Sequence, residues 1–202
     1  LTIGGVMFMH NYSGGGQLLT LGIITVLYVM GTWWRDIIHE AAFEGQHTSV
    51  VKEGLRLGMI LFIVSEIMFF FAFFWAFFTS LLTPVLSIGG VWPPVGIEVI
   101  SSWGLPLLNT ILLLSSGATV TWAHHAIVGG LKQEAQTSLY LTLTFAIYFT
   151  TFQFLEYIEA PFCISDGVYG STFFMATGFH GFHVIIGTIF LIVCAIRLYF
   201  DH

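Results

Sequence analysis

The sequence contains few charged side chains. Charged residues make up 8% of its 202 residues, hydrophobic residues make up 56%, and the mean hydropathy is +0.90. A soluble globular domain carries about 25% charged residues. So few charges cannot cover a surface that faces water, which excludes an ordinary soluble protein and predicts a chain surrounded largely by lipid. The net charge of −6 rests on few charges, and it does not indicate a nucleic-acid partner.

Cysteine is also scarce, and motifs for chemistry are missing. The separation of Cys163 and Cys194 fits neither a disulfide nor a pair of metal ligands. The sequence has no glycine-rich nucleotide loop, no specific Ser/His/Asp pattern and no cysteine pair spaced for zinc. We therefore expect no catalytic residue and no metal site in this chain.

Long apolar segments occupy most of the chain. Uniform apolarity over about 20 residues predicts membrane-spanning helices, because barrel strands would alternate over about ten residues. The sequence therefore predicts an all-α, polytopic transmembrane helix bundle. The first segment begins within apolar sequence at Leu1, so we expect it to be the end of a helix that is cut short. The predicted single membrane domain, residues 1–202, has its segments at 1–9, 17–34, 57–83, 105–123, 135–155 and 172–196.

The five basic residues all fall in alternate loops. Arg35, Lys52 and Arg56 follow the second segment, Lys132 follows the fourth and Arg197 follows the sixth. The intervening loops contain neither Lys nor Arg. Loops rich in basic residues stay on the cytoplasmic or matrix side of a membrane. The pattern therefore predicts that side for the three basic loops, and it supports the number of helices.

One acid lies within the third apolar segment. Glu66 stands in the string VSEIMFFFAFFWAFF, where a carboxylate costs several kcal/mol unless it is neutral or partnered. Its neighbours on the same helix face are apolar, so a partner must come from another helix. Equal depth from the inner side points to Thr25, Ser115 or Thr144, with His183 a turn further out. Hydroxyl groups cannot balance a charge, and we therefore expect Glu66 to be uncharged near neutral pH.

A pair of tryptophans and a cation lie at the inner end of the second segment. Trp33, Trp34 and Arg35 are residue types that contact phospholipid headgroups at a membrane boundary. Arg56 is the nearest second cation along the predicted topology. We predict a bound lipid at these four residues, and the alternative is an ordinary aromatic belt.

Histidines form two small groups. His124 and His125 end the fourth segment, and His180 and His183 share one face of the sixth, in GFHGFHVIIG. A redox metal in a membrane bundle usually needs histidines that face each other across helices. No Cys or Met forms a copper-type cluster with these residues. We therefore predict polar packing for these histidines, and lipid contact for His180 and His183, rather than a metal.

Acidic residues gather at the outer end of the fifth segment. Glu156 and Glu159 are followed by Asp166 in the next loop. The group is either interfacial charge or, in the case of Glu156, an intramembrane acid with a specific His or Trp partner. Both interpretations stay open from the sequence.

Five long strings follow one another along the chain: WWRDIIHEAAFEGQHT, LRLGMILFIVSEIMFFFAFFWAFF, GGVWPPVGI, PLLNTILLLSSGATVTWAHHA and FQFLEYIEAPFCISDGVYGSTFFMATGFHGFHVIIGTIFLIVCAIR. In the same order, they resemble cytochrome c oxidase subunit III over essentially the whole chain. The segment EYIEAPFCISDGVYGSTFF is similar to the mitochondrial branch of that family.

The resemblance implies a fold of seven helices in two groups around a V-shaped cleft that holds phospholipids. Here about six would be present, with the first cut short and the seventh absent, either by truncation or because a separate chain supplies it. It also implies that the chain itself binds no haem or copper. Haem a and copper would lie in partner subunits I and II, which oxidise cytochrome c, reduce oxygen to water and pump protons. Glu66 occupies the position of the family's buried acid.

The resemblance thus implies a non-redox core subunit of the terminal respiratory oxidase. It would hold phospholipids and support proton uptake and the stability of the catalytic subunit. Its partners would be subunit I, as the main contact, subunit II and accessory subunits. Its location would be the mitochondrial inner membrane, with the bacterial cytoplasmic membrane as the alternative.

Two other classes of function stay open. An independent proton or small-solute transporter could use Glu66 as its carrier, but it should show polar residues along a path, and the third segment has little else that is polar. A membrane cytochrome could use His180 and His183, and its bound haem would give an optical spectrum.

Overall fold

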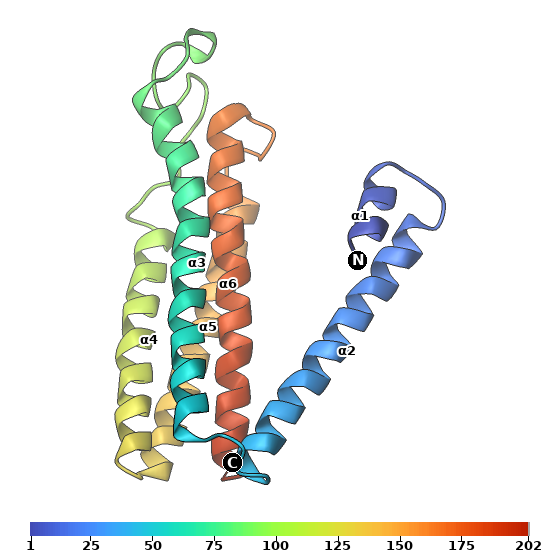
Figure 1. Cartoon of the computed structure of the whole chain (residues 1–202). Helices are drawn as coiled ribbons and strands as arrows, with labels where there is room; N and C mark the ends of the chain where they lie inside the picture. Colours follow the sequence, from blue (N-terminus) through green and yellow to red (C-terminus); the bar gives the residue numbers. More distant parts are fainter. Residues whose placement is uncertain (202) are drawn as a thin grey trace. The chain divides into compact units, whose positions relative to one another are not determined.

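A computed structural model describes residues 1–201 as an all-helical protein without strands in that range (Figure 1). Five of the helices, α2 to α6, are long and apolar enough to cross a membrane. This confirms the all-α class and the polytopic helical pattern that the sequence predicts. The elements are α1 (Thr2–Met9), α2 (Gly15–Ala42), α3 (Ser49–Leu82), the short 3-10 helix η1 (Leu86–Ile88), α4 (Leu105–Val128), α5 (Lys132–Glu159) and α6 (Gly167–Tyr199).

Several helices extend beyond the predicted segments. Helix α2 continues past Trp34 to Ala42, and α3 begins at Ser49 rather than at residue 57. Helix α6 begins at Gly167 rather than at residue 172. Hydropathy identifies only the part of a helix that suits lipid, whereas polar turns rich in Ala, Glu, Lys and Arg also favour helix. Most of the polar stretch 35–56 is therefore helical, and only residues 43–48 lie between α2 and α3.

The chain divides into two compact units, Leu1–Phe62 and Ile63–His202, with the boundary inside α3. The predicted single membrane domain stays a prediction. In the first unit, α1 packs closely against α2. A Cβ atom added at Gly4 would lie 2.5 Å from the backbone nitrogen of Leu19, and one at Gly15 would lie 2.6 Å from that of Phe8. Glycine thus lets the two backbones touch, as small residues do in membrane helix pairs.

In the second unit, α4 packs along α5 through small side chains. The buried residues at this contact include Ala123, Ala126, Ala135 and Ser138. The hydroxyl groups of Thr119 and Thr142 form a hydrogen bond of 2.8 Å between the two helices. Small residues allow close approach, and an interhelical hydroxyl bond of this kind contributes about 0.6 kcal/mol in a membrane protein.

Helix α6 also packs against α5. Ala195 joins Ala123 and Leu139 in the buried apolar cluster of this unit. At the end of α6, the ammonium group of Lys132 donates to the carbonyl oxygen of Tyr199 at 3.1 Å and lies 2.6 Å from a carboxylate oxygen of Asp201. The first residue of α5 is thereby connected to the last residues of α6.

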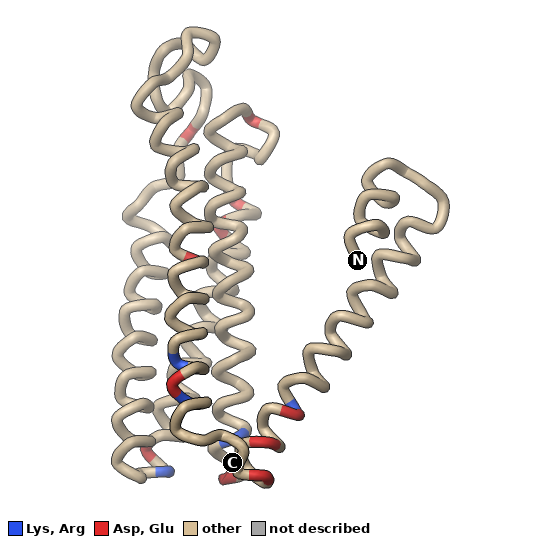
Figure 2. Tube along the Cα trace, viewed as in Figure 1, with Lys and Arg blue, Asp and Glu red and all other residues tan. Residues whose placement is uncertain are grey.

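Most large apolar side chains lie on the outside of the chain. Figure 2 shows that the charged residues gather mainly toward the ends of the helices, whereas the long middle stretches are almost free of charge. A surface of this kind needs lipid or other subunits to cover it.

Candidate functional site

Glu66 and His183 form a side-chain pair between α3 and α6. The Nε2 atom of His183 lies 2.5 Å from Oε2 of Glu66. This finding corrects the expectation from depth, which placed Thr25, Ser115 or Thr144 nearest to the acid. The partner of Glu66 is an imidazole, so the argument that only hydroxyl groups could reach the carboxyl group does not hold.

The other ring nitrogen of His183 fixes how protons are arranged in this pair. Nδ1 lies 2.6 Å from the carbonyl oxygen of Phe179, which can only accept a hydrogen bond. Nδ1 must therefore carry a hydrogen. One further proton then lies between Nε2 and Glu66, either on the carboxyl group of a neutral pair or on the imidazolium of an ion pair. In both forms one proton lies between Nε2 of His183 and Oε2 of Glu66.

Aromatic rings flank the Glu66–His183 pair on part of its surface. The ring of Phe70 meets that of His183 edge-on at 4.9 Å, and Phe69 packs edge-on against Phe179 at 5.1 Å. Phe73 adds a contact with Phe179 at 5.0 Å. These long side chains carry the contact between α3 and α6, whose backbones stay further apart. The result is an apolar frame around a single polar pair.

The Glu66–His183 pair is not enclosed by the chain. The side chain of Glu66 is 32% exposed and that of His183 is 34% exposed. Phe179 and Glu66 occupy both ring nitrogens of His183, so no nitrogen is left for a lipid headgroup. The pair is therefore partly accessible from outside the chain, but its imidazole is not free.

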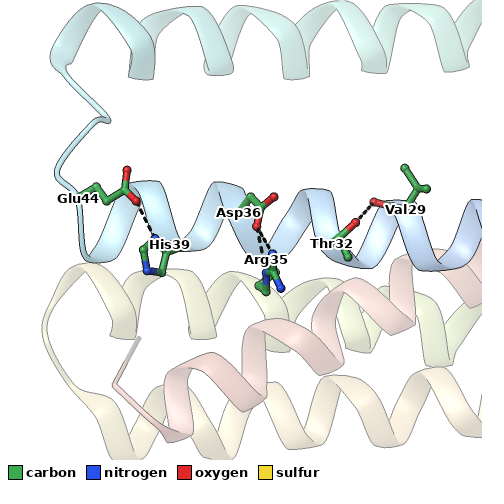
Figure 3. A network of polar contacts seen from close by, with 6 residues as sticks. All are labelled: Val29, Thr32, Arg35, Asp36, His39 and Glu44. Carbon is green, nitrogen blue, oxygen red and sulfur yellow. Dashed lines mark hydrogen bonds and ion pairs between the residues drawn. The ribbon is translucent and has the colours of Figure 1, made fainter.

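The predicted lipid-binding residues at the end of α2 have a polar setting of their own. Trp33 and Trp34 are exposed. The Arg35 guanidinium donates two hydrogen bonds, of 3.0 and 2.7 Å, to one carboxylate oxygen of Asp36 (Figure 3). Its side chain is still 74% exposed, so donors remain available. Arg56 is exposed and lies in the first part of α3.

A second pair of polar side chains lies at the end of α2. His39 lies 3.0 Å from a carboxylate oxygen of Glu44, just past the end of the helix (Figure 3). This pair and the Arg35–Asp36 pair give the last turns of α2 a polar surface next to the two tryptophans.

The other histidines are not brought together with His183 into a metal site. His180 is exposed, and its ring meets Phe149 edge-on at 6.2 Å. The rings of His124 and His125 lie 5.8 Å apart at the end of α4. Within residues 1–201, no group of three or more His, Cys, Asp or Glu side chains could hold a metal ion.

Glu156 is buried at the outer end of α5, with 9% of its surface exposed. It lines a cavity together with Glu159 and Glu98. The structure gives its carboxylate no His or Trp partner within residues 1–201, contrary to one of the two interpretations of the sequence. No pattern in the sequence connects Glu98 with Glu156, because the loop that carries Glu98 is distant along the chain from α5.

Comparison with known proteins places the chain in a family. The family model of cytochrome c oxidase subunit III matches residues 1–202. Among curated proteins named cytochrome c oxidase subunit 3, that of Pylaiella littoralis is 74% identical over 202 residues, which cover 100% of this chain and 74% of the relative. Those of Marchantia polymorpha and Arabidopsis thaliana are 66% and 63% identical, and each match covers 100% of this chain and 76% of the relative.

These matches extend over the whole chain and agree with the all-helical fold and its five long apolar helices. The family that the five long strings of the sequence resemble is thus confirmed. The chain belongs to the cytochrome c oxidase subunit III family.

Proposed function

We propose that the chain is a non-redox core subunit of a terminal oxidase that holds phospholipids and supports proton uptake and the stability of the catalytic subunit. Membership of the family makes it a subunit of the oxidase complex. The proposal extends this to direct contact with subunits I and II, which would carry haem a and copper. It also places the complex in the mitochondrial inner membrane.

The Glu66–His183 pair carries the proposal of a proton-related role. A carboxyl group and an imidazole that share one proton, set in an apolar frame and open on one side, can bind and release that proton locally. Intramembrane ionisable groups are functional candidates for this reason. The pair connects two helices, so the same contact also supports the packing of α3 on α6.

Replacing Glu66 with Gln separates these two roles. Glu66→Gln keeps the shape, and its amide can donate to Nε2 of His183, but it cannot release a proton. We expect the purified oxidase to retain the subunit, while the rate of proton uptake by the complex falls and its dependence on pH changes. Glu53→Gln, an exposed acid near the start of α3, serves as the control. Unchanged proton uptake in the Glu66→Gln oxidase would refute the proton-related role.

The lipid-holding role is supported by the exposed surface of Trp33, Trp34 and Arg35, with Arg56 as a second cation. A phosphate group can accept from a guanidinium while the indole rings lie at headgroup level. We expect Arg35→Ala combined with Arg56→Ala to lose bound phospholipid in native mass spectrometry of the oxidase. Lys52→Ala, another cation in the first turns of α3, is the control. An unchanged lipid complement in the double variant would remove this part of the proposal.

A further inference from the structure

A cavity of about 510 Å³ lies where α4 begins and α5 ends. The loop before α4 contributes Glu98, and the last turn of α5 contributes Glu156 and Glu159. Leu105 and Pro106, from the first turn of α4, complete one wall. The three carboxyl groups therefore come from two segments that are far apart in the sequence.

All the ionisable residues that line this cavity are acidic. None of its lining residues is Lys or Arg. The two basic residues of this unit, Lys132 and Arg197, lie at the opposite ends of α5 and α6. The carboxyl end of α5 adds the negative end of a helix dipole beside Glu156 and Glu159. No cation within the described part of this unit can therefore reach the cavity.

One buried polar side chain that lines the cavity is left without a partner. Glu156 is 9% exposed and lines the cavity, yet no residue among 1–201 forms a hydrogen bond or ion pair with it. Asn109 is 4% exposed, and both its amide oxygen and its amide nitrogen lack a hydrogen-bond partner. Asn109 lies in α4 one helical turn beyond Leu105, but it is not among the residues that line the cavity.

Such groups are costly when they stay unpaired, because a buried polar atom loses its water without a replacement. An unpartnered, buried Glu156 beside Glu98 and Glu159 indicates a bound group with several hydrogen-bond donors and a positive charge. A bare metal ion does not fit, because the carboxyl groups among residues 1–201 do not converge closely enough to hold one. The cavity is also far larger than an ion.

We propose that this cavity receives a basic side chain, Lys or Arg, from a neighbouring subunit of the oxidase. Its extended stem would lie along Leu105 and Pro106, and its ammonium or guanidinium group would donate to Glu156 and to the rim acids Glu98 and Glu159. The inference rests on membership of the oxidase complex. It does not depend on the Glu66–His183 pair or on bound phospholipid.

A cryo-electron microscopy map of the intact oxidase at neutral pH tests the proposal directly. We expect a Lys or Arg nitrogen of another subunit within about 4 Å of the Glu156 carboxylate. Water, a metal ion or a lipid amine as the only occupant would overturn it. A chain that fails to copurify with the large subunits would instead contradict the proposed function, so the two failures are distinguishable.

A charge-neutralising variant provides a second measurement on the same complex. Glu156→Gln should make the neighbouring subunit dissociate about 30-fold faster or more in a salt wash, since removing one member of a buried charge pair acts mainly on the dissociation rate. Glu53→Gln is the matched control and should behave as wild type. If the oxidase that carries Glu156→Gln does not assemble, Glu98→Gln takes its place, because Glu98 is exposed. Glu98→Gln should also make the neighbouring subunit dissociate faster, but to a smaller extent. Dissociation at the wild-type rate in Glu156→Gln, or in Glu98→Gln where Glu156→Gln does not assemble, would overturn the proposal.

Discussion

Removal of the His183 imidazole should destabilise the contact between α3 and α6. His183→Leu deletes the bond to Glu66 at 2.5 Å and the bond to the Phe179 carbonyl at 2.6 Å. It leaves the Glu66 carboxyl group in an apolar frame without its partner. Glu66→Gln is milder, because its amide group can still donate to Nε2.

The size of the effect follows from the bonds and their exposure. A hydrogen bond that involves a charged group contributes about 1.5–3 kcal/mol, and a neutral one about 0.5–1.5 kcal/mol. The pair is about one-third exposed in the chain, so the lower end of the first range applies. We expect His183→Leu to cost about 2–3 kcal/mol and Glu66→Gln less than about 1 kcal/mol. Because the amide introduced by Glu66→Gln can still donate to Nε2, the coupling measures only the charge-dependent part of the bond and should be about 1 kcal/mol, or roughly fivefold in an equilibrium constant.

A double-mutant cycle on the purified oxidase measures this coupling. The readout is the fraction of dodecyl sulfate in mixed micelles at which half of the chain is released, converted to free energy for the wild type, both single variants and the double variant. His180→Leu, which removes an exposed histidine on the same helix, is the matched control for the cycle with Glu66→Gln. For the control cycle with His180→Leu, we expect a coupling energy within about 0.5 kcal/mol of zero. A coupling energy that small in the cycle with His183→Leu would refute the pairing of Glu66 with His183.

Two further predictions concern helix contacts away from the Glu66–His183 pair. Lys132→Met should remove the link to Asp201 and increase hydrogen exchange at the end of α6, at a cost of only about 0.2–1 kcal/mol because the pair is exposed. Gly4→Leu should separate α1 from α2 and cost about 1–3 kcal/mol, because its side chain would collide with the Leu19 backbone. Gly5→Leu is the control, because the nearest side-chain atom would lie 4.0 Å from its Cβ. Equal effects of the two glycine changes in the dodecyl sulfate titration would contradict this explanation.

The helices could be predicted from the sequence because lipid-facing segments must be uniformly apolar. The ends of the helices could not, because polar turns such as those before Leu57 and after Trp34 fold as helix without being hydrophobic. This error in the helix ends also explains the wrong partner for Glu66. With α3 beginning at Ser49, Glu66 lies about 26 Å along the helix from its inner end at 1.5 Å per residue.

The predicted depth of His183 was also wrong, because α6 extends beyond its predicted end. His183 lies about 24 Å from Tyr199, the last residue of α6, so acid and imidazole are at nearly equal depth. The shorter predicted segments placed them a turn apart. The cavity around Glu156 was predictable only in part, because no pattern along the chain connects Glu98 with the end of α5.

The placement of the basic residues has a practical consequence for mapping this protein by proteolysis. Arg35 lies near the end of α2, Lys52 and Arg56 in the first turns of α3, Lys132 at the start of α5 and Arg197 near the end of α6. Trypsin, which cleaves after Lys and Arg, therefore has no position to cut in the loops before α4 and before α6. Complete digestion leaves residues 57–132 and 133–197 as two long apolar peptides, which conventional peptide mapping recovers poorly. A chymotryptic digest, which cuts after aromatic residues, is the better choice for detecting labels at Glu66 or Glu156.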